Sequence, residues 1–390
     1  MVQNKKLSTP ANLLAIIQIV ILYYLVVFTG TAQAQTPSFF CDIRNETYVS
    51  ANIFEFDLYI TRTSILPLEL ACFQSAIKIN TAFINGGDIT PSIVTSSSEF
   101  NAHQVPLAIN FVQGSNNCIK LAPRLPRTNY TAPVATNGTM VASNIGTKVC
   151  RIRLSNTLSF GSSPINYAWN YTVSPYNSIV SAFVPGTPAI NTIVSSANDF
   201  AVSNNVNVFL EGLYNGSEMN KAKNEFGDGQ FNGPVADLVT IQLATAPGSI
   251  VKEFSNVNLL QNGTCSIGLP ASSAGSYYIV VKHRNSIETW SANPVTFSSN
   301  PISYNFTNAA NKAAGDNMKD FSNGFFGIYA GDADQDGGVG VSDMVLIDNQ
   351  SALFASGYLV EDIDGDGGVG VSDMTIVDNN SAAFVSVIYP

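Results

Sequence analysis

Residues 332–343 read Asp-Ala-Asp-Gln-Asp-Gly-Gly-Val-Gly-Val-Ser-Asp, and residues 362–373 read Asp-Ile-Asp-Gly-Asp-Gly-Gly-Val-Gly-Val-Ser-Asp. Each stretch has aspartate at positions 1, 3, 5 and 12 and glycine at position 6. Carboxylates at alternate positions point toward one centre, and Gly337 and Gly367 permit the sharp turn that such a loop needs. The pattern therefore predicts two equivalent cation-binding loops.

The oxygen-rich composition of these loops favours calcium, which takes six to eight oxygen ligands. Two carboxylates about 4 Å apart repel by roughly 4 kcal/mol at an effective dielectric constant of about 20. We therefore expect two Ca²⁺ ions, one in each loop, and a segment that folds only when they bind. The predicted ligands are Asp332, Asp334, Asp336, Gly338 and Asp343 in the first loop and Asp362, Asp364, Asp366, Gly368 and Asp373 in the second.

Short apolar runs follow the two loops, at residues 344–347 and 374–377, and predict a helix leaving each loop. The approach to the first loop is short, aromatic and broken by glycine, so no entering helix is expected. In these features residues 327–390 resemble a dockerin, the duplicated calcium module that docks into cohesin domains. The resemblance implies partner contacts at positions 10 and 11 of each loop, which are Val341, Ser342, Val371 and Ser372. Many dockerins carry Ser or Thr where this sequence has valine. The alternative is a terminal clamp that calcium stiffens and that has no partner.

The net charge of −10 belongs to the same segment. Residues 327–390 contain eleven acidic side chains and no Lys or Arg, so the 17 other acidic residues are balanced by all 18 basic ones. Because no Lys/Arg cluster occurs beyond the first few residues, we expect no nucleic-acid partner.

The N-terminus predicts export. Lys5 and Lys6 precede an apolar run over residues 13–28, and Ala32-Gln33-Ala34 is a small-x-small cleavage site. We interpret residues 1–34 as a signal peptide and expect a secreted, extracellular or cell-surface protein that is not membrane-embedded after cleavage. A membrane anchor is the alternative, but the run is shorter than the ~20 residues of a span and Gln18 interrupts it.

Export permits disulfides, and the chain has five cysteines. Four of them lie in the first part of the chain, at Cys41, Cys72, Cys118 and Cys150. The simplest expectation is two bridges among these four, with Cys265 free and buried.

The rest of the chain predicts strands. Phe54, Phe56, Leu58 and Ile60 alternate with polar residues, which indicates a strand with one buried face, and similar short runs follow between turn signals. We expect a mainly β protein, with two tandem β-sandwich domains (residues 35–198 and 199–312), a linker (residues 313–326) and a small α-helical dockerin-like calcium module. The first sandwich resembles a cohesin or cellulose-binding domain over residues 52–59, 70–74, 151–156 and 169–172. Residues 275–290 make the second resemble an Ig-like or transthyretin-like domain.

Catalytic patterns are sparse. The chain has two histidines and contains no Gly-x-Ser-x-Gly elbow, phosphate loop or His-Glu-x-x-His motif, so we predict no catalytic residues. Glu55 and Asp57 on one strand face are the alternative, because a glycosidase needs only two carboxylates. Trp169 and Trp290, with the pair Tyr277-Tyr278, are candidate glycan contacts, although such aromatics are more often core residues.

Together these features predict a secreted, non-catalytic, calcium-binding adhesion or assembly protein. Its partner would be a cohesin-like domain on another protein or on another copy of this chain. Contacts between copies would join different surfaces and build a filament. The alternative is a carbohydrate-binding accessory, or a component of an extracellular polysaccharide-degrading system, with a polysaccharide as partner.

Overall fold

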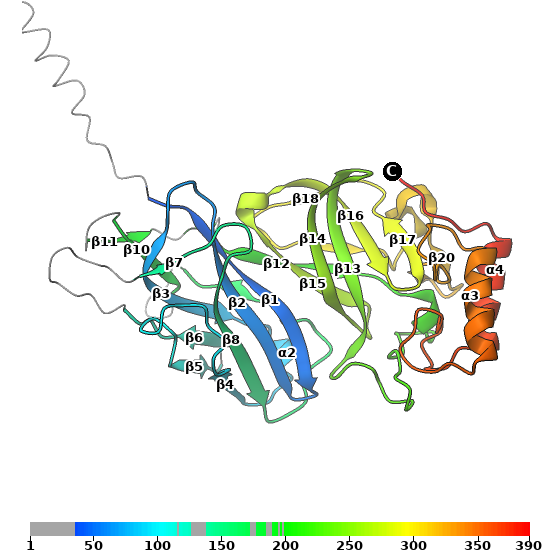
Figure 1. Cartoon of the computed structure of the whole chain (residues 1–390), viewed down its shortest axis with the longest axis horizontal. Coiled ribbons are helices and arrows are strands. Elements are labelled where there is room, and N and C mark those ends of the chain that lie inside the picture. Colours follow the sequence, from blue (N-terminus) through cyan, green and yellow to red (C-terminus); the bar gives the residue numbers. More distant parts are fainter. Residues whose placement is uncertain are drawn as a thin grey trace, which may run out of the picture.

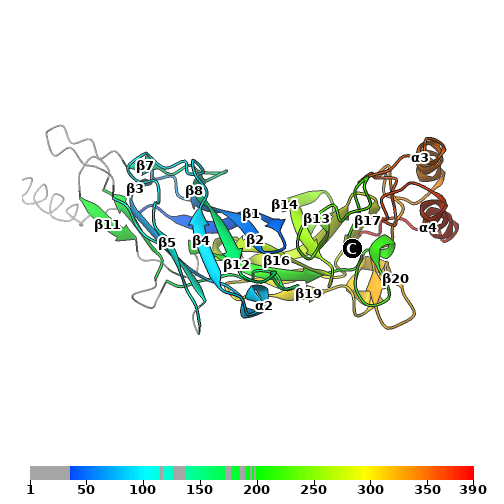
Figure 2. The same cartoon turned by 90° about the horizontal axis from the view of Figure 1, so that it is seen from below.

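The computed structural model describes residues 36–114, 117–125, 138–171, 177–184, 189–193, 196 and 199–390. The described chain is elongated, with one β-sandwich at one end, a second in the middle and two helices at the other end (Figures 1 and 2). The prediction of a mainly β protein with a small helical C-terminal part is confirmed. The predicted signal peptide lies outside the described residues. Within those residues, no helix is long and apolar enough to cross a membrane.

The first sandwich pairs two antiparallel sheets. One sheet has the strand order β1-β2-β8-β4, and the other has the order β11-β10-β3-β6-β5, with β7 and β9 also paired to β3. The strands are β1 (Phe39–Ser50), β2 (Ile53–Arg62), β3 (Glu69–Lys78), β4 (Ile89–Ile93), β5 (Ile109–Val112), β6 (Cys118–Leu121), β7 (Thr139–Met140), β8 (Thr147–Asn156), β9 (Ala168–Trp169), β10 (Ile179–Phe183) and β11 (Ile190–Ile193). A single helical turn, α2 (Thr81–Ile84), begins at Asn80, whose side chain accepts a hydrogen bond from the Ala82 N–H.

The alternation in β2 explains the core of this sandwich. Phe54, Phe56, Leu58 and Ile60 are fully buried and join one apolar cluster with residues of the facing sheet. Side chains point alternately to the two faces of a strand, so one face of β2 packs on the core along its whole length.

The opposite face of β2 carries Glu55 and Asp57, the two carboxylates considered above for a glycosidase, and both are buried. Arg151 of the neighbouring strand β8 forms ion pairs with both, at 2.6 Å and 3.0 Å. Burial opposes ionisation of these carboxyls, but the hydrogen bonds from arginine outweigh it and lower the pKa of Glu55. Two carboxylates neutralised in this way do not supply the acid and base of a glycosidase.

The predicted disulfides are wrong, because all five cysteines are free. Cys41 on β1 and Cys150 on β8 lie on opposite sides of β2, and strands spaced about 4.8 Å apart leave these residues about 10 Å apart. Cys118 pairs with Lys78, six residues along β3 from Cys72, a separation of about 20 Å. A disulfide needs α-carbons within about 7 Å.

The second sandwich also has two sheets. One has the order β15-β12-β19, and the other has the order β14-β13-β16-β17, with β18 paired to β16. The strands are β12 (Ala201–Asn207), β13 (Val235–Ala246), β14 (Ser249–Leu260), β15 (Thr264–Pro270), β16 (Gly275–His283), β17 (Ser286–Trp290), β18 (Val295–Phe297) and β19 (Ser303–Asn305). Short 3-10 turns occur at η2 (Glu211–Leu213) and η3 (Ala271–Ser273). A separate apolar cluster fills this sandwich.

Residues 313–326, the predicted linker, are folded against the second sandwich. The segment forms the turn η5 (Ala314–Asp316) after η4 (Ala310–Lys312), then β20 (Lys319–Asp320), which pairs with β21 (Phe326–Gly327). Met318 is buried in the core of the second sandwich, and the ring of Phe321 stacks on Tyr214 at 4.0 Å. The many Asn, Gly and Lys residues led to the prediction of a linker, but these few apolar side chains hold the segment against the sandwich.

Candidate metal centre

Each predicted loop is followed by a helix, as expected. These helices are α3 (Val341–Ala352) and α4 (Val371–Ala382), which lie side by side at the end of the molecule (Figures 1 and 2). The glycine at position 6 has a left-handed backbone in both loops, with φ of 94° at Gly337 and 88° at Gly367. Only glycine adopts this conformation without steric cost, so the turn that the sequence predicted is present twice.

Three aspartates converge in each loop. Asp332, Asp334 and Asp343 each offer a carboxylate oxygen, and these oxygens lie within 4.8 Å of one another. The second loop repeats the arrangement with Asp362, Asp364 and Asp373. The aspartates at position 5 lie outside these groups, and each accepts a hydrogen bond from a backbone N–H two residues on, at 2.9 Å for Asp336 and 3.0 Å for Asp366.

The aspartate at position 12 ties each loop to its helix. Asp343 accepts backbone hydrogen bonds from Ala333 and Asp334 through Oδ1 and from Gly340 through Oδ2, at 2.7 to 3.1 Å. Asp373 makes the same three bonds in the second loop. Because these donors are neutral N–H groups, they orient the carboxylate without cancelling its charge.

The surroundings of the aspartate at position 1 indicate whether a cation fits in each loop. Asp332 and Asp362 are almost fully buried, and Oδ1 of each has no hydrogen-bond partner. Burial, together with the carboxylates of Asp343 and Asp334, raises the pKa of Asp332 to about 7. A buried, unpaired carboxylate oxygen facing two further carboxylates is strongly unfavourable unless a cation is bound. The donor set is entirely oxygen, which suits Ca²⁺ rather than a thiolate- or imidazole-binding metal.

The tip of the β16–β17 hairpin holds the second loop from the sandwich side. Asn285 Nδ2 donates to the backbone carbonyls of Val360 and Asp362, at 3.1 Å and 2.9 Å. Arg284 donates to the carbonyls of Leu359 and Asp362 and lies over the ring of Tyr358. These long-range contacts could not be predicted from the sequence, because the residues at the hairpin tip have the composition of an ordinary polar turn.

A buried charged cluster lies beneath this contact. Asp237 accepts hydrogen bonds from His283 Nε2 at 3.1 Å, from Arg284 and from the Tyr358 hydroxyl. His283 Nδ1 is 2.9 Å from Ser286 Oγ, so a Ser-His-Asp arrangement exists. All three side chains are almost fully buried. Without access for a substrate, the cluster is a structural link between the sandwich and the loops.

The first loop is attached to the same sandwich through Glu211 of η2. One carboxylate oxygen of Glu211 accepts from the Ala330 N–H at 3.0 Å and from Asn380 Nδ2 at 2.6 Å, and the other pairs with Lys319 at 2.6 Å. Ile287 of β17 is fully buried in the apolar cluster that contains Ile347 and Val377 of the helices. The loops and the second sandwich therefore share a core.

The four residues predicted to bind a partner are all exposed at the starts of α3 and α4, where Val341 is 72% and Val371 82% exposed. The structure adds two residues that the sequence reading missed. Phe354 and Phe384, thirty residues apart and therefore equivalent in the repeat, are 90% and 89% exposed just beyond the helix ends. The recurrence of phenylalanine at the same position of both repeats was the available signal.

The two candidate glycan contacts do not form one platform. Trp169 belongs to the core of the first sandwich and stacks on Phe200 at 4.8 Å. Trp290 lies on the second sandwich, donates to Glu288 at 2.6 Å and contacts the ring of Tyr389. Both tryptophans are buried, which agrees with the alternative that these aromatic residues belong to the core.

Fold and site together define a mainly β chain with a duplicated acidic loop. No protein-family model and no curated protein matches the sequence. Similar solved structures include the second type II cohesin module of the ScaA scaffoldin of Acetivibrio cellulolyticus, at 11% identity and TM-score 0.26, covering 43% of this chain and 92% of that chain. The fimbrial adhesin FimA of Actinomyces is 10% identical, with TM-score 0.22, covering 69% of this chain and 98% of that chain. The major pilin SpaD of Corynebacterium diphtheriae has 10% identity and TM-score 0.21, covering 69% of this chain and 64% of that chain. Likenesses of this size carry no argument about function.

Proposed function

We propose that this chain is an exported, non-catalytic assembly protein whose C-terminal module docks to a partner when calcium is bound. The supporting observation is the pair of equivalent three-aspartate groups, each with a buried carboxylate oxygen that lacks a partner. Each loop would hold one Ca²⁺ through its aspartates at positions 1, 3, 5 and 12 and the carbonyl at position 7. The bound ion would supply the positive charge that lets these carboxylates stay ionised together.

The docking surface in this proposal consists of the exposed apolar residues around the two helices. Val341 and Val371 begin the helices, and Phe354 and Phe384 follow them. Isolated surface aromatics are common, but an exposed phenylalanine repeated at equivalent positions of a duplicated unit favours a binding surface. The resemblance to dockerins makes a cohesin-like domain the proposed partner.

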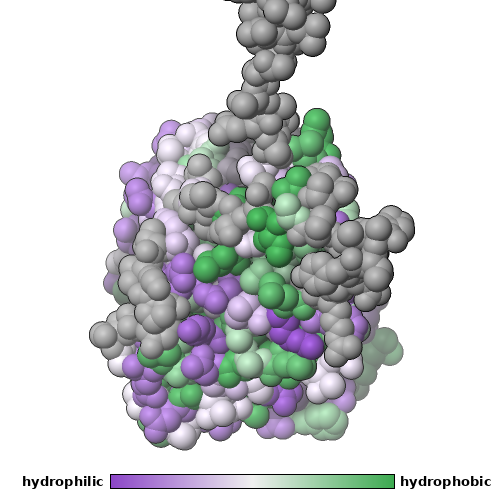
Figure 3. Space-filling model, turned by 90° about the vertical axis from the view of Figure 1, so that its left-hand side faces the viewer, coloured by the Kyte–Doolittle hydropathy of each residue, from purple (hydrophilic) through white to green (hydrophobic). Residues whose placement is uncertain are grey.

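That partner domain belongs either to another protein or to a second copy of this chain. The helices lie at one end of the elongated molecule and the first sandwich lies at the other (Figure 1). If the first sandwich of one copy receives the helices of the next, the contact is head-to-tail and extends into a filament. Figure 3 looks onto the end of the first sandwich, where the described surface mixes hydrophobic and hydrophilic residues.

The test is light scattering during size-exclusion chromatography of residues 35–390, first with calcium and then with a chelator. Calcium-dependent large species are expected if copies dock to one another. A monomer that becomes more compact with calcium would assign the docking partner to another protein. A size and shape that do not respond to calcium would refute the proposal.

A matched pair of variants separates docking from folding. The double variant Phe354→Ser/Phe384→Ser should keep its response to calcium and lose about 100-fold or more in affinity for the partner, because two exposed aromatic anchors are removed. Phe226→Ser is the control, since Phe226 is 80% exposed on a loop of the second sandwich. Equal loss in both variants would contradict the proposed surface.

A further inference from the structure

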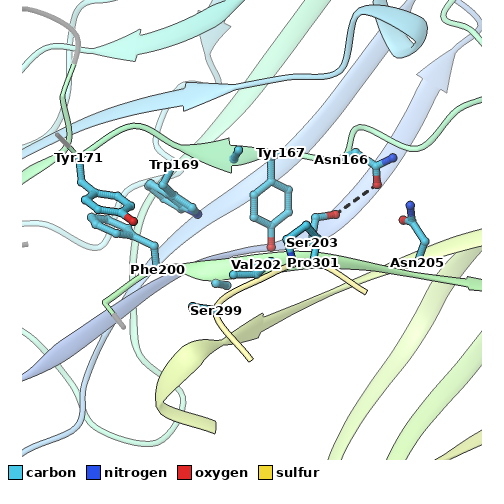
Figure 4. Close-up of a pocket in the computed structure, with 12 residues that line it drawn as sticks. Asn166, Tyr167, Trp169, Tyr171, Phe200, Val202, Ser203, Asn205, Ser299 and Pro301 are labelled. Atoms are coloured by element: carbon cyan, nitrogen blue, oxygen red, sulfur yellow. Dashed lines mark hydrogen bonds between the residues drawn. The ribbon is translucent and has the colours of Figure 1, made fainter. Parts of the chain in front are cut away.

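A pocket lies at the seam between the two sandwiches, away from the calcium loops. Its volume is about 430 Å³, within the range of about 300–1,000 Å³ typical of small-molecule sites. The walls come from the end of the first sandwich around β9, from the start of β12 and from the turn after β18 (Figure 4). Three segments distant in sequence therefore enclose one cavity.

One wall is aromatic and rigid. Trp169 and Tyr171 both stack on Phe200, with ring centroids 4.8 Å and 5.5 Å from that of Phe200. The stack fixes the indole plane of Trp169, and Figure 4 shows its nitrogen on the side of the ring that faces Tyr167. An indole held in this way presents its N–H edge to the cavity.

Among the described residues, that N–H group has no hydrogen-bond partner. Trp169 is 8% exposed, and its Nε1 is buried without a hydrogen bond. On the other side of Tyr167, the amide oxygen of Asn205 is also buried and unpaired. Leaving a buried donor or acceptor unsatisfied costs about 1–3 kcal/mol, so native proteins rarely retain such groups without a reason. The Tyr167 hydroxyl between them is also buried and has no hydrogen-bond partner among the described residues, so three polar groups at the same cavity indicate a ligand that supplies both donors and acceptors.

The lining limits the chemistry of that ligand. The described residues of the lining include no charged side chain, and their other polar groups are the amide of Asn166 and the hydroxyls of Ser203, Ser299 and the tyrosines. Ser203 Oγ lies 2.7 Å from Ser266 Oγ and 3.4 Å from Asn166 Oδ1, so this hydroxyl already has a close partner within the protein. A neutral molecule with several hydroxyl groups and an apolar face fits, whereas a phosphorylated or carboxylated one would lose its charge solvation.

We propose that this seam pocket binds a neutral saccharide. The Trp169 N–H donates to one sugar oxygen, the Asn205 carbonyl accepts from a sugar hydroxyl, and the aromatic wall covers the apolar face of the ring. The site is independent of calcium docking, because none of its lining residues belongs to residues 327–390.

The test uses the full mature chain and its two tryptophans. The probes are cellobiose, maltose, lactose and diacetylchitobiose, with a glucuronate-containing disaccharide and a blocked neutral peptide for comparison. Indole N–H signals are followed by NMR during each titration. We expect one neutral disaccharide to shift the Trp169 signal downfield while the Trp290 signal, already bonded to Glu288, stays in place. No shift with any neutral disaccharide, or a shift with the peptide alone, would overturn the proposal.

Trp169→Phe keeps an aromatic ring that can stack on Phe200 but removes the N–H donor, together with part of the volume of the indole. It should bind the disaccharide roughly tenfold more weakly, as expected for one lost hydrogen bond. Unchanged affinity would contradict the proposal. The melting temperature without ligand should fall, because the smaller ring leaves a cavity beside Phe200, so affinity is measured at a temperature at which both proteins are folded. Trp290→Phe is the matched control and should leave affinity unchanged.

Discussion

At the scale of single residues, the aspartates at position 1 of the loops are the most informative groups. Asp332 lies within 4.8 Å of two other carboxylates, a distance at which each pair repels by roughly 3.5 kcal/mol at an effective dielectric constant of about 20. Burial and the neighbouring carboxylates raise its pKa, and its Oδ1 has no hydrogen-bond partner among the described residues. The Asp332 carboxylate therefore destabilises the folded loop when no cation is bound, and it can act as a ligand when one is.

Asp332→Asn should consequently change stability in opposite directions in the two states. With chelator, the variant loses a buried charge and gains an amide that can donate to Asp334 or Asp343, so its melting temperature should rise by about 2–4 °C. With calcium, it should lose most of the stabilisation that the ion gives to the wild type. Calorimetry under both conditions measures this. Asp348→Asn, on the exposed side of α3, is the charge-matched control and should change little. A lower melting temperature in chelator would contradict the account of Asp332.

At the scale of elements, the two loops are nearly identical in sequence but not in surroundings. Position 4 is Gln335 in the first loop and Gly365 in the second, and both have a left-handed backbone. The Gln335 side chain donates to the Ser286 carbonyl at the hairpin tip. Gly365 instead packs against η2, where an added Cβ would lie 2.3 Å from Leu213 Cδ2. The sandwich thus breaks the twofold symmetry that the repeat implies.

Exchanging these two residues should expose the asymmetry. Gly365→Gln forces a side chain into Leu213 and strains the backbone, so it should cost about 2–4 kcal/mol of stability. Gln335→Gly loses a surface-side contact but relieves a strained φ, so its effect should stay within about 1 kcal/mol. Urea denaturation in saturating calcium measures both. Similar losses in the two variants would show that the loops are equivalent after all.

The loops and their exiting helices could be predicted because their ligands, turn glycines and helix starts are all local in sequence. The attachment of the loops could not, since it depends on Arg284 and Asn285 meeting carbonyls more than seventy residues away. The same limit explains the wrong disulfides, because cysteine spacing carries no information on which strands lie between. The packing of residues 313–326 could not be predicted for a third reason: a few buried residues such as Met318 hold the segment in place despite its polar composition.

At the scale of the whole molecule, the calcium loops are not an independent domain on a tether. Leu210 forms a β-bridge with Ile328, and Ser286 forms one with Ala330. The C-terminal tail links the first loop to the sandwich: the Val387 N–H donates to the Gly337 carbonyl of the loop at 2.8 Å, and the Val387 side chain packs against the sandwich cluster that contains Trp290. Figure 1 shows the C-terminus beside the second sandwich rather than beside the helices. A shared core of this kind unfolds as one cooperative unit.

Calcium should therefore stabilise the second sandwich as well as the loops. In differential scanning calorimetry of residues 35–390, we expect calcium to raise one transition, assigned to residues 199–390, by several degrees for each ~2–3 kcal/mol of binding free energy. The transition of the first sandwich should rise less, because in the described part of the chain it is joined to the second sandwich, through Val235 and Leu260 in its core, and not directly to the loops. Trp290 fluorescence should change together with the calcium-sensitive transition, since its ring contacts Tyr389 of the C-terminal tail. If the helices melt in a separate calcium-dependent step that leaves Trp290 unaffected, the loops are a tethered domain and the shared core does not couple them.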